Sequence, residues 1–162
     1  MRNWIWKAAG AAILLIAAGG MGWTEIREGR VRAAELRALV KLIRFIRENI
    51  ERLSKPLGEI FAEYADPLLE SSCFLPTARR EGMERAAHSV RWHLSEEERA
   101  ILYSFAAALG KGYREEQAEL CRMTESRLSD AERELRESAP GRERLWRSIP
   151  VLMALSAILL FL

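Results

Sequence analysis

The chain has 162 residues, of which 30% are charged, and its formal net charge is +2. This length allows one modest domain with additional segments and excludes a large multidomain enzyme. All 23 acidic residues, and every basic residue except Arg2 and Lys7, lie between positions 25 and 147. This mixture of charges indicates solvated helix faces and excludes the strongly basic surface of a nucleic-acid-binding protein.

Two uncharged apolar stretches, residues 8–24 and 148–162, lie at the ends of the chain. A helix that crosses a bilayer needs roughly 20 apolar residues, and tryptophans often mark its interfaces. The tryptophans that flank these stretches are Trp4, Trp6, Trp23 and Trp146. We therefore predict transmembrane helices in residues 1–24 and 148–162, around a domain of residues 25–147. The alternatives are a cleaved signal peptide for the first stretch and a buried core helix for the second.

Basic residues near the predicted spans indicate the orientation in the membrane. Ten basic residues lie within about 20 positions of the membrane on the domain side, whereas the other side has only Arg2, Lys7 and the amino terminus. This bias predicts a cytoplasmic domain with both termini across the membrane.

Residues 25–53 read as one long helix with a heptad seam. Its apolar residues are separated by alternating steps of three and four: Leu36, Leu39, Ile43, Ile46, Ile50 and Leu53. This spacing is typical of a helix that packs along its length against another helix. It predicts the core of a helical bundle, with a dimeric coiled coil as the alternative. The basic opposite face is a solvated face or a surface for anionic lipid.

The following segment contains shorter elements. Ser54 is a helix cap with Pro56 in the first turn, and Asp66-Pro67 ends that helix. Residues 67–82 have no regular pattern. We expect helices at 83–93 and 96–109, the second opened by a capping box of Ser95 and Glu98.

A glycine corner, Gly110-Lys111-Gly112, precedes a long polar helix over residues 113–138, which Pro140-Gly141 ends. The thin apolar stripe of this helix comprises Gln117, Leu120, Thr124, Leu128, Ala131 and Leu135. The first and last long helices both return to the membrane, which favours an antiparallel pair. No stretch alternates with period two, so the fold class is all-α.

The sequence contains no pattern of a catalytic or cofactor site. The glycine corner lacks the earlier glycine and the Ser or Thr after lysine that a phosphate-binding loop needs. His88 and His93 lie on different helix faces and pair with no cysteine at metal-ligand spacing. Cys73 and Cys121 are predicted to be free thiols in a reducing compartment. We predict a protein that is not an enzyme and uses no cofactor, metal or small-molecule substrate.

Short motifs, in order along the chain, carry a resemblance to a known family. They are Ile50 six residues before Pro56-Leu57, then Leu109-Gly110 followed by Arg114-Glu115 and Gln117, and finally Ile158-Leu159-Leu160. Together with the order of spans and long helices, they resemble the stage III sporulation protein AB family over essentially the whole chain. Asn49, Arg52, Tyr113 and Pro150 depart from the family's pattern.

The resemblance implies a compact bundle of about six helices, similar to the cytoplasmic domains of type II secretion and type IV pilus inner-membrane platform proteins. It implies a platform component of the channel between mother cell and forespore, in the mother-cell membrane around the forespore. Its expected partners are other proteins of that channel, especially a secretion-type ATPase.

Corners between long helices that start at a bilayer point away from it, so the predicted partner surface is at two corners. Its residues are Leu109, Gly110, Arg114, Glu115 and Gln117, with Pro56 and Leu57 as second choice. An alternative for Gly110 and Gln117 is that they only shape the corner. The alternative function is a membrane-anchored coiled-coil scaffold of envelope or division machinery, and a third possibility is a secreted helical domain.

Overall fold

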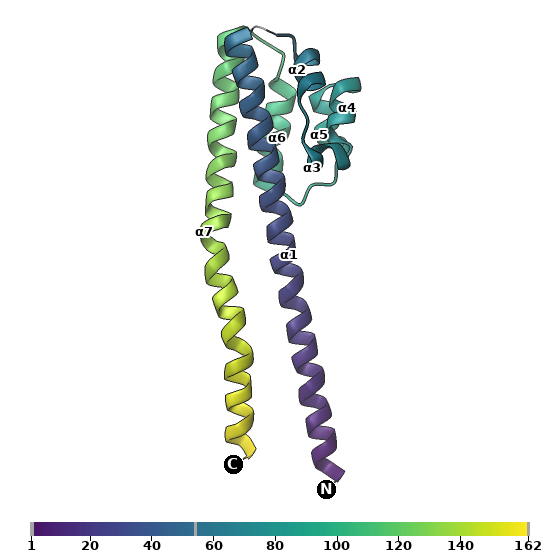
Figure 1. Ribbon diagram of the computed structural model, residues 1–162, viewed down its shortest axis with the longest axis vertical. Helices are drawn as coiled ribbons and strands as arrows, with labels where there is room; N and C mark the ends of the chain where they lie inside the picture. Colours follow the sequence, from purple (N-terminus) through teal and green to yellow (C-terminus); the bar gives the residue numbers. More distant parts are fainter. Residues whose placement is uncertain (1, 54, 162) are drawn as a thin grey trace. The chain divides into compact units, whose positions relative to one another are not determined.

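The computed structural model describes the backbone of residues 2–53 and 55–161, and side chains in 27–53 and 55–137. Within these residues the protein is all-α, as predicted, with seven helices and no strand (Figure 1). The family resemblance implied about six helices, and the sequence patterns themselves predicted five. The two additional helices lie within residues 67–82, a segment without a readable pattern.

The chain divides into two compact units, one formed by Val31–Arg136 and the other by Met1–Arg30 with Glu137–Leu162. The second unit comprises the beginning of α1 (Arg2–Leu53) and the end of α7 (Arg114–Phe161). Among the described residues, no helix combines the length and apolarity that crossing a bilayer requires. The apolar stretches 8–24 and 148–162, and the predicted anchors Trp4, Trp6, Trp23 and Trp146, lie outside the residues whose side chains are described.

In the unit Val31–Arg136, ion pairs show that α1 and α7 run antiparallel. Arg37 Nη2 lies 2.9 Å from Glu132 Oε1, and Arg44 Nε lies 2.7 Å from Glu125 Oε1. Arg122 Nη2 lies 2.7 Å from Glu51 Oε1, so positions on α7 fall as positions on α1 rise. These exposed or half-buried pairs align the two helices and add little stability individually.

The heptad seam of α1 forms the centre of the core. Leu36, Leu39, Ile43 and Ile46 have no exposed surface, and Ile50 is 8% exposed. This confirms the prediction of a bundle core for these positions. Leu53, which continues the same spacing, is the last residue of α1 and is 59% exposed.

Four short helices lie on the side of α1 opposite α7 within this unit: α2 (Leu57–Glu63), α3 (Pro67–Ser71), α4 (Phe74–Glu81) and α5 (Met83–Ser89) (Figure 1). Ring contacts hold this layer in place. Phe45 of α1 packs against Tyr64 after α2 with ring centroids 5.1 Å apart, and Phe74 meets Trp92 edge-on at 5.5 Å. These aromatic pairs are buried or half-buried and so connect the layer to the core.

In this layer two sequence predictions fail and a third is incomplete. Pro56 is the N-cap of α2 and not part of its first turn, because its extended backbone (ψ 147°) precedes the helix; Ser54 is outside the described residues. The helix α2 ends at Glu63, before Asp66-Pro67 as predicted, but Asp66 also begins α3, since its carboxylate accepts from the N–H groups of Leu68 and Leu69. The helix expected at 83–93 ends at Ser89, where Val90 becomes extended.

The capping box at the start of α6 (Glu96–Ala108) is confirmed, and it also connects α6 to α1. The Ser95 hydroxyl accepts from the Glu98 N–H at 3.2 Å, and Glu98 Oε2 accepts from the Ser95 N–H at 2.7 Å. Glu98 also accepts two hydrogen bonds from Arg32 of α1, at 2.7 and 2.8 Å. Burial acts to raise the pKa of Glu98, but the bonds from Arg32 and Ser95 outweigh it and hold the pKa below its ordinary value.

The long polar helix does not end near Ser138 as predicted, because α7 continues through Pro140 to Phe161. A proline removes one backbone donor, and neighbouring turns can maintain a helix around that loss.

Candidate interaction site

The structure brings together the two corners that the sequence predicted as a partner surface. Gly110, just after α6, has φ +84°, a conformation that favours glycine. A Cβ on Gly110 would lie 3.1 Å from Leu57 Cδ1 at the start of α2. The two segments are therefore in contact. We call Pro56, Leu57 and residues 109–117 the corner surface.

Gln117 holds this corner from inside. Its Oε1 accepts from the Gly110 N–H at 2.8 Å, and its Nε2 donates to the carbonyls of Lys111 at 2.9 Å and Ala108 at 3.3 Å. The side chain is buried, and its amide group is fully engaged with the corner backbone. Gln117 thus determines the shape of the corner and is not exposed on it.

The exposed part of the corner is formed by the start of α7. Tyr113 is 78% exposed and its N–H donates to Glu116 Oε2 at 3.2 Å, which caps the helix. Arg114 donates to the backbone carbonyl of Glu51, near the end of α1, and Glu115 is exposed. Tyr113 and Leu53 are two of the three large hydrophobic side chains exposed in the described part of the chain. This end of the unit therefore combines apolar and charged groups open to a partner.

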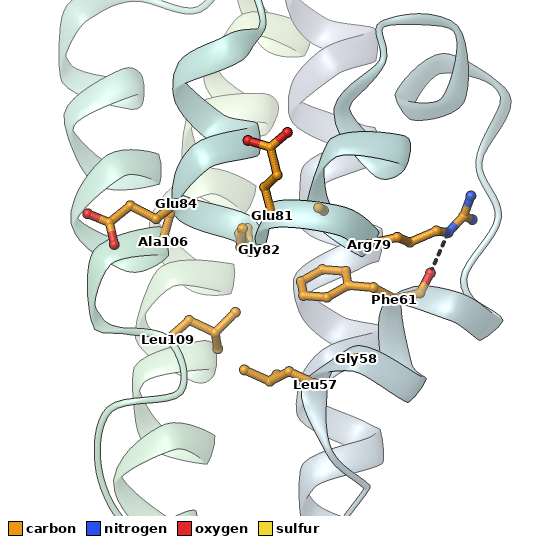
Figure 2. Close-up of a pocket in the computed structure, with 11 residues that line it drawn as sticks. Leu57, Gly58, Phe61, Arg79, Glu81, Gly82, Glu84, Ala106 and Leu109 are labelled. Atoms are coloured by element: carbon orange, nitrogen blue, oxygen red, sulfur yellow. Dashed lines mark hydrogen bonds between the residues drawn. The ribbon is translucent and has the colours of Figure 1, made fainter.

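A surface pocket of about 370 Å³ adjoins the corner (Figure 2). Four segments line it: α2, the end of α4 with Gly82, the start of α5, and the end of α6 with Leu109. Its apolar lining consists of Leu57, Phe61, Ala78, Met83, Ala106 and Leu109. Figure 2 shows Leu57 and Leu109 pointing toward each other across the pocket, with the ring of Phe61 beside them. We call this the corner pocket.

Three charged residues, Arg79, Glu81 and Glu84, also line the corner pocket. Arg79 extends away from it and donates to the carbonyl of Phe61 at 2.9 Å (Figure 2). It also donates to the carbonyl of Tyr64 at 2.8 Å. Arg79 also pairs with Glu70 of α3 at 2.6 Å, so its donors are occupied by the end of α2 and by α3. Glu81 and Glu84 are exposed on either side of Gly82.

The corner was predicted from the sequence, whereas the pocket was not. Leu57 and Leu109 were predicted as partner residues, whereas Phe61, Ala78, Met83 and the two carboxylates were not. Gly82, with φ +89°, was visible only as an interruption of the pattern. Nothing local indicates that four separate segments meet, because that contact depends on tertiary packing.

The two cysteines occupy different environments. Burial raises the pKa of the Cys121 thiol to about 12, so it stays protonated and unreactive at neutral pH. Cys73 is exposed at the start of α4. Within the described residues, no group of His, Cys, Asp and Glu side chains is arranged to hold a metal ion.

Comparison with known proteins agrees with the sequence motifs. The family model described as stage III sporulation protein AB matches residues 7–162. No curated protein and no solved structure matches the chain.

Proposed function

The chain belongs to the stage III sporulation protein AB family and is a sporulation-related protein, and from this premise we propose that it is a platform of the channel between mother cell and forespore. Its unit Val31–Arg136 docks a secretion-type ATPase, and the corner surface is the docking site. The protein is not an enzyme; it positions its partner at the membrane.

The observation that carries this proposal is the contact between the two corners. Leu57 and Gly110 are 53 positions apart in sequence, yet they meet beside an apolar pocket and the exposed side chains of Tyr113 and Arg114. Interfaces combine an apolar centre with a polar rim, and the corner surface offers both. A binding role without catalysis is consistent with Gln117 and Arg79, whose polar groups are engaged in holding backbone.

Membrane attachment belongs to the same proposal. Two apolar ends with flanking tryptophans serve as anchors, and the excess of arginines on the domain side favours a cytoplasmic unit, where ATP and the ATPase are found. The membrane is that of the mother cell around the forespore.

The alternative of a coiled-coil scaffold requires the heptad seam of α1 to be free for another chain. Leu36, Leu39, Ile43 and Ile46 are fully covered within the unit itself. The structure therefore favours a platform over a scaffold built on this seam.

Charge reversal at the corner tests the proposal. In the full-length, detergent-solubilised chain, Arg114→Glu should weaken capture of the purified channel ATPase about tenfold. The substitution replaces an exposed interface arginine with a negative charge, next to that of Glu115. The matched control is Arg127→Glu, which reverses an exposed arginine further along α7. Equal capture by wild type and both variants would remove the corner surface from consideration. No capture by wild type would contradict docking itself.

A further inference from the structure

The lining of the corner pocket points to an aliphatic occupant. Leu57, Phe61, Met83 and Leu109 provide apolar walls, and Figure 2 shows Leu57, Phe61 and Leu109 converging on the space between them. The volume of about 370 Å³ is at the small end of the range for ligand pockets. No polar side chain points into its centre to orient a polar small molecule. One or two aliphatic side chains from a partner segment suit these walls better.

The charges around the pocket point to a basic occupant. Among the described side chains, Glu81 pairs with Arg85 at 3.3 Å, and Glu84 pairs with Lys111 at 3.8 Å. All four side chains are at least half exposed. Exposed ion pairs of this kind contribute little and can be exchanged for partner cations at small cost. Arg79, the other charged lining residue, is committed to α2 and to Glu70. Glu81 and Glu84 are therefore the charged groups at the rim of the pocket with which a partner can pair.

We infer that the corner pocket binds a short segment of the partner ATPase that inserts a Leu- or Ile-like side chain and sets a Lys or Arg against Glu81 and Glu84. This inference rests on the proposed docking function and adds to it the chemistry of the docked segment. The aliphatic group supplies the buried centre of the contact, and the basic group fixes its orientation.

Gly58 offers a way to block the pocket without straining the fold. It lines the pocket on α2, and a Cβ at this position would meet nothing within 4 Å. Gly58→Leu should therefore occupy the space and weaken capture of the ATPase about tenfold or more, the effect of losing one buried aliphatic side chain. Ala62→Leu is the matched control, because it adds an aliphatic side chain to an exposed position of the same helix outside the pocket.

The rim is tested separately. Glu81→Lys combined with Glu84→Lys should weaken capture by a similar factor, and more strongly at low than at high salt. Glu48→Lys, on the exposed face of α1, makes the same kind of charge change away from the pocket. Thermal unfolding of each full-length variant in detergent shows whether it is folded.

The experiment compares wild type and all variants in capture of the purified ATPase. The inference predicts capture by wild type, Ala62→Leu and Glu48→Lys, and loss in the pocket and rim variants. Wild-type capture that persists in folded Gly58→Leu and in the double rim variant would overturn the pocket while leaving docking intact. If wild type captures no ATPase, the proposed function itself fails, and the inference fails with it.

Discussion

The two long helices and the layer of short helices differ in how the sequence encodes them. In α1, the apolar residues of the heptad seam are buried as their spacing predicts, except Leu53. In α2 to α5, each helix has five to eight residues, too few for a periodic pattern to establish itself. The two long helices, which we call the frame, are specified by local sequence patterns. The short helices need packing against the frame to form, and they contribute most of the corner pocket.

The largest effect should come from breaking the frame. Ile43→Ala should lower the free energy of unfolding of the unit by about 2–5 kcal/mol, because Ile43 is fully buried and its loss leaves a cavity. Leu53→Ala, at an exposed position of the same seam, should change it by less than about 0.5 kcal/mol. Hydrogen exchange of residues 31–136 in the solubilised full chain measures both. Similar losses of stability at the two positions would contradict the conclusion that the buried part of the α1 seam ends before Leu53.

An intermediate effect should come from Glu98, which joins the two regions through Arg32. Glu98→Gln should cost about 1–3 kcal/mol near neutral pH by removing charged hydrogen bonds. The pKa of folded Glu98 lies below its ordinary value of 4.5, so the stabilisation is present above that value and is lost as pH falls through the folded pKa. The difference between wild type and Glu98→Gln should therefore shrink in acid. A difference independent of pH would assign the loss to packing instead.

The smallest effect should come from the ion pair between Arg37 and Glu132 on the surface of the frame. Arg37 is about half exposed, so Arg37→Ala should cost less than about 1 kcal/mol, and the loss should diminish at high salt. Hydrogen exchange at low and high ionic strength measures it. A loss as large as that of Ile43→Ala would mean that ion pairs and not the apolar seam hold the long helices together.

Local chemistry explains which features were predictable. The capping box of Ser95 and Glu98, the seam of α1 and the turn at Gly110 each depend on residues within one or two turns of a helix. Asp66-Pro67 was read only as a helix end, although an Asp before Pro is also a helix start, and that reading would have found α3.

The remaining features depend on distant residues. Arg32 and Glu98 are 66 positions apart. Glu35 accepts from the backbone N–H of His93, 58 positions away, and its other carboxylate oxygen lies 2.8 Å from His93 Nδ1. The corner pocket likewise combines four segments. Helical periodicity contains no information about such partners, so a single sequence predicts the corner but not the pocket beside it.

The central claim is that this unit faces the cytoplasm as a docking platform, and the exposed Cys73 allows a direct test. The measurement is labelling with a membrane-impermeant thiol reagent in intact vegetative cells that produce the full chain, and again after lysis. Cys121 is buried and its pKa is raised, so it should not be labelled. A variant with Asn3→Cys carries a cysteine on the predicted opposite side of the membrane. The account predicts that Cys73 is labelled only after lysis and that the cysteine at position 3 is labelled in intact cells. Labelling of Cys73 in intact cells would contradict it and place the corner surface across the membrane from any ATPase.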